Sequence, residues 1–112
     1  MHSDGAAAVQ QALERVFSAN GGLVRFSLPD GELGRPGDNL CRLSFIEARP
    51  HKLLVELDEQ LLLVLTEPAV VEVTDRHARV TFEQLTFDWQ EYGNLRPHAK
   101  TYTAGEMTFV GQ

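Results

Sequence analysis

Side chains able to do chemistry are concentrated between residues 87 and 102 of this 112-residue chain. The passage holds the only Trp and both Tyr residues, together with carboxylates, an arginine, a lysine and a histidine. Carboxylate, imidazole and phenol groups brought together can transfer protons, whereas aromatic rings beside arginine are typical of protein-binding surfaces. No catalytic or ligand-binding motif frames these residues, so their types leave both functions open.

Strand alternation divides this passage into two sets of side chains. In a strand, Phe87 and Trp89 point to one face while Asp88 and Tyr92 point to the other, and we expect the first two to lie in the core. If the next strand pairs with this one as a hairpin, its alternating polar residues can lie opposite Asp88 or Tyr92. The candidate binding residues are then Asp88, Tyr92, Arg96, His98, Lys100 and Tyr102. The simpler interpretation is a core strand with a solvated outer face, because cross-strand charges are ordinary stabilisers of sheets.

The first functional hypothesis is a non-catalytic module that binds another protein or helps an assembly to form through this hairpin. Trp89 or Tyr92 would be the apolar anchor, and Arg96 and His98 would be polar contacts. A homodimer through an exposed strand edge is one version of this hypothesis. A further possibility is a subunit of a larger assembly, whose recognition surface forms only there. The loop position of these residues favours recognition over catalysis.

The alternative hypothesis is a small-ligand site or an acid/base enzyme pocket between the sheet and the helix. Its border would comprise Asp88, His98, Lys100 and Tyr102. Convergence of these side chains would distinguish an enzyme from an interface. We expect no cofactor in either case.

Other candidate motifs favour structure over function. The turn-rich segment 29–39 lacks the Lys-Ser/Thr ending of a phosphate loop, leads into a strand, and misses the spacing of a calcium loop. His51, His77 and His98 lie in separate predicted turns or loop ends, so we expect no metal site. Cys41 alternates within a strand pattern, as a small buried side chain does, and would need a partner such as His51 or His98 to act as a nucleophile.

The elements that would position these residues begin with an amphipathic helix over residues 5–19. Its apolar stripe comprises Val9, Ala12, Leu13, Val16 and Phe17. Ser3 or Asp4 can cap its first turn, and the Asn-Gly-Gly sequence at 20–22 tolerates the left-handed conformation that ends a helix.

A period of two then replaces the helical period, in short segments divided by tight turns. The pattern predicts strands near residues 24–28, 40–48, 52–57, 60–66, 69–74, 79–82, 85–89 and 100–110. Apolar residues at both parities in 53–57 and 61–65 predict central strands that are covered on both faces.

The successive segments 79–82 and 85–89 conflict in parity. Val80 and Phe82 alternate in one phase, whereas Leu85, Phe87 and Trp89 alternate in the other. A bulge or small turn near residues 83–84 is therefore predicted if all five side chains face the core.

This order of elements predicts one α+β domain over residues 1–112 that is mostly β. The helix would pack on a strongly bent antiparallel sheet, or on a small open barrel, of about six to eight strands within residues 23–110. The strand order and the choice between barrel and rolled sheet stay open.

Composition excludes several classes of function. Ten basic against sixteen acidic residues give a net charge of −6 without a basic cluster, which argues against binding to nucleic acid or anionic lipid. A single cysteine rules out an intrachain disulfide and fits a reducing compartment. The start of the chain lacks signal-peptide features, and the longest apolar run, residues 61–65, is too short to cross a bilayer. We therefore expect a soluble cytoplasmic protein.

Overall fold

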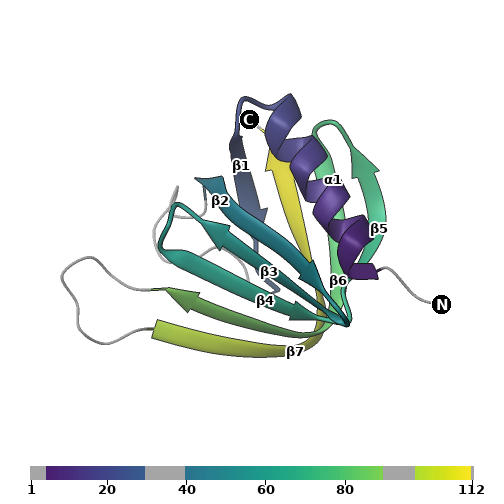
Figure 1. The fold of residues 1–112 in the computed structure, drawn as a ribbon, viewed down its shortest axis with the longest axis vertical. Coiled ribbons are helices and arrows are strands. Elements are labelled where there is room, and N and C mark those ends of the chain that lie inside the picture. Colours follow the sequence, from purple (N-terminus) through teal and green to yellow (C-terminus); the bar gives the residue numbers. More distant parts are fainter. Residues whose placement is uncertain (1–4, 30–39, 90–97, 112) are drawn as a thin grey trace.

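One helix and seven strands make up the fold in residues 5–29, 40–89 and 98–111, which the computed structural model describes (Figure 1). The elements are α1 (Gly5–Ala19), β1 (Leu23–Ser27), β2 (Leu40–Arg49), β3 (Lys52–Leu57), β4 (Leu61–Thr66), β5 (Ala69–Thr74), β6 (His77–Trp89) and β7 (His98–Gly111). Every pairing among these strands is antiparallel. The predicted fold class, an N-terminal helix packed on a bent antiparallel sheet, is confirmed.

α1 has the bounds that its sequence pattern predicts, because one side of the pattern can be buried. Val9, Leu13 and Val16 are fully buried, whereas Glu14 and Arg15 on the other side are exposed. The proposed capping residues at its start lie outside the described residues.

The end of α1 is fastened to the β5–β6 hairpin. Gly21 and Gly22 have φ angles of 68° and 86°, which suit glycine at the end of a helix. The side chain of Asn20 donates from Nδ2 to a carbonyl of the last helical turn at 2.7 Å and to the carbonyl of Asp75 at 2.8 Å. Arg15 Nε also forms an ion pair with Asp75 Oδ1, at a distance of 2.7 Å. The helix is therefore held at its C-terminal end by polar contacts as well as by packing.

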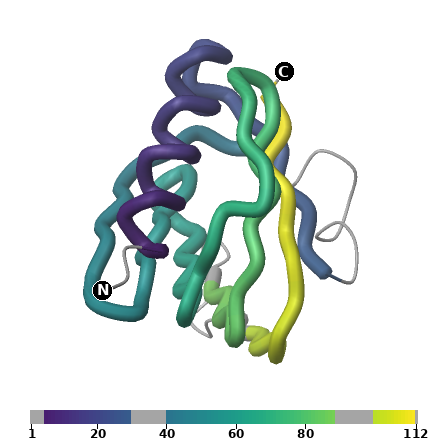
Figure 2. The backbone as a smooth tube through the Cα atoms, turned by 90° about the vertical axis from the view of Figure 1, so that its right-hand side faces the viewer, coloured from purple at the N-terminus to yellow at the C-terminus, as the bar shows by residue number. Residues whose placement is uncertain are grey.

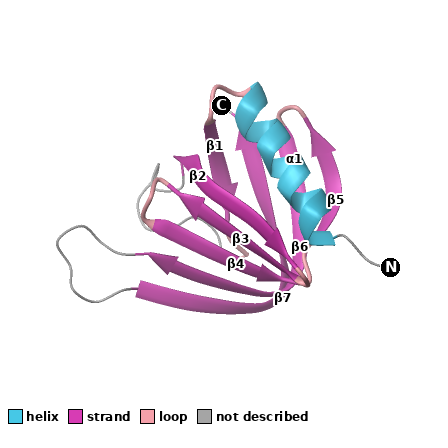
Figure 3. Ribbon diagram, viewed as in Figure 1, coloured by secondary structure: helices cyan, strands magenta, loops and turns pink. Residues whose placement is uncertain are grey.

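The strands form a ring of hydrogen bonds rather than a regular barrel. Their order is β4-β3-β2-β1-β7-β6-β5, and an additional pairing of β4 with β6 closes the ring (Figure 3). β6 pairs along one edge with β5 near its start and with β4 near its end. Figure 1 shows the result: β2, β3 and β4 fan out to the lower left, while β5 stands beside α1.

The β6–β7 ribbon buries opposite faces at its two ends. Val80 and Phe82 near its start and Leu85 and Phe87 near its end are all buried, although the two pairs differ in parity. The predicted bulge near residues 83–84 is wrong, because the β6–β7 pairing keeps one register from residue 77 to residue 89. The buried side changes instead, where the neighbour of β6 changes from β5 to β4.

α1 covers the inner side of the sheet. It packs mainly against β5 and β2, and the tube view shows it lying between the β2–β3 hairpin and β5 (Figure 2). Beneath it lies one continuous core, in which Phe26, Phe87, Phe109 and Leu63 are fully buried. The inner face of the sheet is thus covered by α1 and needs no further cover.

Candidate interaction surface

The register of the β6–β7 hairpin separates the predicted site residues onto two faces. Asp88 lies opposite Ala99, whereas Lys100 lies opposite Phe87, and Tyr102 shares the face of Lys100. The expectation that Asp88 would lie across from Lys100 or Tyr102 is therefore wrong. The reason is that this register pairs even-numbered residues of β6 with odd-numbered residues of β7.

Among the remaining predicted residues, Lys100 and Tyr102 have described side chains. Tyr102 is partly buried and packs against the core, and Lys100 is exposed. The backbone of His98 pairs with that of Trp89, but their side chains are not described. Tyr92 and Arg96 lie outside the described residues. Of the six candidates, only Asp88 is placed on the side of the sheet that faces away from the core.

Asp88 belongs to a surface formed by cross-strand rows over β2, β3, β4 and β6. The first row consists of Phe45, Glu56, Leu62 and Asp88. The middle row consists of Glu47, Leu54, Val64 and Thr86. The last row consists of Arg49, Lys52, Thr66 and Gln84. We call these three rows the outer face.

Apolar side chains lie in the first and middle rows of the outer face. Phe45 is 46% exposed and Leu62 is 36% exposed, and Leu54 and Val64 are partly exposed beside them. Their sequence neighbours on β3 and β4 point inward and are fully buried. The prediction that β3 and β4 are covered on both faces is therefore wrong for the described part of the chain, where α1 covers only the inner face.

A bulge in β2 turns Phe45 outward. The β2–β3 register shifts by one residue between Leu43, which packs against the core, and Phe45, which lies opposite Glu56. The extra residue, Ser44, accepts a 2.6 Å hydrogen bond at Oγ from the backbone amide of Glu59 in the β3–β4 turn. Because side chains alternate along a strand, one inserted residue exchanges the inward and outward sets.

Asp88 carries an unsatisfied oxygen on this surface. Its Oδ1 atom is buried and has no hydrogen-bond partner in the described part of the chain. A buried carboxylate oxygen without a donor costs free energy, so native proteins seldom leave one unpaired. Because the atom is covered within the chain, a donor from outside can satisfy it only when the carboxylate turns toward solvent.

The charged residues of the outer face separate by sign. Glu56 and Asp88 lie in the first row, whereas Arg49 and Lys52 lie directly opposite each other in the last row. Arg49 forms an ion pair with Glu47 of the middle row. Lys52 and Glu56 form no ion pair with any described residue. The surface is therefore acidic along one edge and basic along the other.

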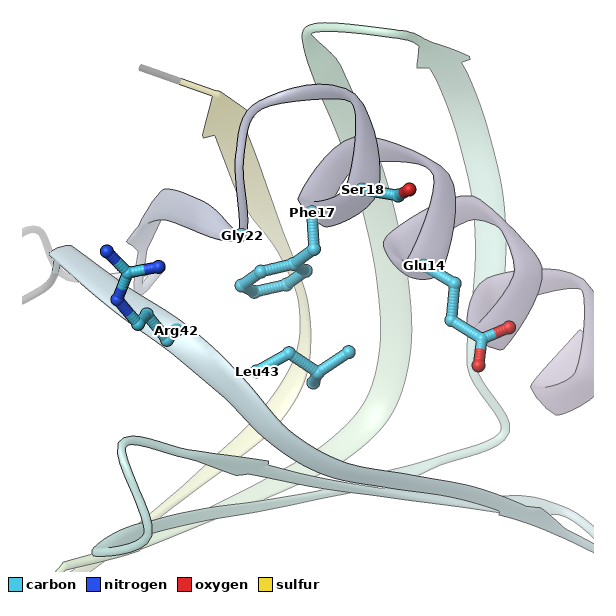
Figure 4. Close-up of a pocket in the computed structure, with 6 residues that line it drawn as sticks. All are labelled: Glu14, Phe17, Ser18, Gly22, Arg42 and Leu43. Carbon is cyan, nitrogen blue, oxygen red and sulfur yellow. The ribbon is translucent and has the colours of Figure 1, made fainter.

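An open groove lies elsewhere, between the end of α1 and β2. It has a volume of about 330 Å³ and is lined by Glu14, Phe17, Ser18, Gly22, Arg42 and Leu43. Figure 4 shows the ring of Phe17 above Leu43 in the middle, with the charged groups of Glu14 and Arg42 at opposite ends. Arg42 already donates to the carbonyl of Gly21 at 3.2 Å. The polar groups that line the groove do not converge, so the groove lacks the geometry of an acid/base site.

Cys41 is held in its thiol form. The side chain is 1% exposed, and burial, the charge of Asp58 and a hydrogen bond to Asp58 together raise its pKa from 9.0 to about 12. Asp58 is fixed there because its Oδ1 also accepts from the backbone amide of Arg42 at 2.8 Å. A thiol with such a pKa is a poor nucleophile at neutral pH.

The described histidines take part in exposed contacts. His51 lies 2.7 Å from Glu67 in the adjacent turn, and His77 lies 4.0 Å from Glu72 on the neighbouring strand. No group of three or more metal-ligating side chains occurs in the described ranges. Nor does any helix within them have the length and apolar character needed to cross a bilayer.

Comparison of the chain with protein-family models, curated proteins and solved structures gives no match. Among the described residues, the outer face is therefore the best candidate for a functional surface. Sequence reasoning found Asp88 but missed Phe45, Leu62 and Glu56, which lie far from it along the chain. The available signal was the doubled apolar pattern of β3 and β4, which indicates a second surface needing cover.

Proposed function

We propose that the protein is a non-catalytic binding or assembly module that recognises a protein partner through the outer face. The observation that carries this proposal is the group of apolar side chains in the first and middle rows of that face, of which Phe45 and Leu62 are exposed by 46% and 36%. Contiguous exposed apolar side chains with a polar rim are typical of protein interaction sites.

The orphaned oxygen of Asp88 supports the same surface. A partner that covers Leu62 also reaches Asp88, because the two residues are directly opposed on β4 and β6. It can then donate the hydrogen bond that Oδ1 lacks. Asp88, the one predicted residue placed on this face, thus becomes a polar contact at the border of an apolar patch.

The alternative, an acid/base pocket, has less support. Asp88 lies on the opposite face of the hairpin from Lys100 and Tyr102, so the described members of that set do not share a pocket. The groove beside α1 contains none of them.

The test compares native complexes formed by the wild-type protein and by a Phe45→Thr/Leu62→Thr variant in extracts of the cells that produce it. Thr suits an exposed strand position, so the variant should fold, which circular dichroism verifies. We expect wild type to elute from a sizing column in a complex larger than one chain and the variant to elute as a single chain. Val110→Thr is the matched control, because Val110 is 38% exposed but lies on β7 away from the outer face. A wild-type protein that elutes as a single chain in extract contradicts the proposal.

A further inference from the structure

The outer face has a charge pattern that is complementary to itself. On β3, Lys52 and Glu56 lie two residues to either side of Leu54. On β6, Gln84 and Asp88 lie two residues to either side of Thr86. The registers align these two triplets in the same rows. A two-fold rotation about the middle row therefore brings Lys52 to the position of Glu56 and Gln84 to the position of Asp88, and the reverse.

We propose that the partner recognised by the outer face is a second copy of this chain, in a two-fold symmetric dimer whose axis runs along the middle row. This inference rests on the proposed function. In that arrangement each strand lies antiparallel over its own copy, and the first row of one chain covers the last row of the other. Lys52 then faces Glu56 of the second copy, and each pairing occurs twice because the interface is isologous.

The same rotation resolves the orphaned oxygen. It places Gln84 of one copy over Asp88 of the other, so that a side-chain amide can donate to Oδ1, which lacks a donor within one chain, when the carboxylate turns outward. In the middle row, Leu54 and Val64 cover their own counterparts. In the outer rows, Phe45 faces Arg49 and Leu62 faces Thr66 of the second copy, beside the charge pairs. The aliphatic stem of Arg49 and the methyl group of Thr66 can cover these two apolar side chains.

Lys52 and Glu56 cannot form an ion pair with each other within one chain. Lys52 and Glu56 are four residues apart on β3, which at the usual rise of a strand is about 13 Å. Neither forms an ion pair with a described residue. Their charges are therefore available to a partner.

A two-fold axis parallel to the strands leaves these charges without opposite partners. Placed between β3 and β4, it would put Glu56 over Leu62 and Asp88 over Phe45 of the second copy, so that carboxylates face apolar side chains. Placed along β4, it would put Glu56 over Asp88, and like charges opposed in an interface cost several kcal/mol. The axis along the middle row is therefore the one that the charges select. Aligned packing of two sheets about 10 Å apart accommodates it, with β3 and β4 at the centre of contact.

The experiment measures the mass of the purified protein by sedimentation equilibrium. At concentrations up to about 1 mM, at which even a weak dimer is populated, we expect twice the single-chain mass of 12.5 kDa. Lys52→Glu and Glu56→Lys should each weaken the dimer by at least about tenfold, since each change introduces two like-charge contacts. The double variant Lys52→Glu/Glu56→Lys, which restores both pairs with reversed polarity, should recover affinity to within about threefold of wild type. Val110→Thr should leave the affinity unchanged.

Two results would overturn the inference. A purified wild-type protein that stays monomeric excludes self-association, and a dimer that is indifferent to the charge reversals uses another surface. The native-complex test separates this failure from that of the proposed function. If the purified protein is monomeric but Phe45→Thr/Leu62→Thr still releases it from a complex in extract, the outer face binds a different protein.

Discussion

Replacing Asp88 by Thr should stabilise the isolated chain while weakening its association. Two terms contribute. Removing a buried carboxylate oxygen that lacks a donor recovers about 1–3 kcal/mol. Thr also replaces a residue that is unfavourable in strands, a change worth up to about 1 kcal/mol, and it matches Thr86 and Thr101 on the same face. Allowing for relaxation of the native carboxylate, we expect the free energy of unfolding to rise by about 1–2 kcal/mol.

Urea unfolding at a protein concentration well below the dimer dissociation constant found by sedimentation, so that the chain is monomeric, measures this change. The matched control is Glu83→Thr, which removes an exposed carboxylate from the same strand and gains only the strand preference. The difference between the two variants therefore isolates the cost of the buried oxygen. A higher midpoint for Asp88→Thr with an unchanged denaturant slope is expected. If Asp88→Thr is no more stable than Glu83→Thr, the oxygen is not a cost to the monomer and its support for an interface is lost.

Three further predictions concern the scaffold. The pKa of the Cys41 thiol rises from 9.0 to about 12 on folding, so the thiol of the unfolded chain loses its proton first as pH increases. The free energy of unfolding should therefore fall by about 1 kcal/mol per pH unit between these two pKa values. Urea unfolding should show this fall in wild type but not in Cys41→Ala. Equal alkaline losses in both proteins would contradict the assignment. Gly111→Ala places a Cβ in steric clash with the Asn20 side chain, so Asn20 should withdraw and lose both of its hydrogen bonds, at a cost of about 2 kcal/mol in thermal unfolding. This cost should shrink in an Asn20→Ala background, and additive costs of the two substitutions would contradict the prediction. Ser44→Ala should cost about 1 kcal/mol through the lost bond to the Glu59 amide, and unchanged unfolding in urea would show that this bond does not hold the bulge.

Local patterns were sufficient for the helix and for most strands. The stripe from Val9 to Phe17 and the following Asn-Gly-Gly sequence predicted the bounds of α1, because both signals act within a few residues. Closure of the ring by β4 and β6 could not be predicted, since it depends on which distant strands meet. The same limit explains the error near residues 83–84: alternation cannot distinguish a bulge from a change in which side is covered.

The candidate site was predictable only in part. Parity placed Asp88 opposite to Phe87, and the structure has them on opposite faces. It could not place Asp88 relative to Lys100, because the register of a hairpin depends on the geometry of the connection between its strands. The apolar residues of β3 and β4 showed that two faces need cover, but a sequence pattern does not say whether the chain or a partner provides it.

The bulge at Ser44 gives β2 one residue more than its pairing with β3 requires. Loss of Ser44 would let Phe45 follow Leu43 directly and keep its place opposite Glu56, so the aromatic ring would stay on the outer face. A deletion elsewhere in β2, where each residue has its own place in the register, would instead exchange the inward and outward side chains beyond it. The bulge is therefore the one point in the paired part of β2 at which the strand can lose a residue without changing which side chains form the outer face.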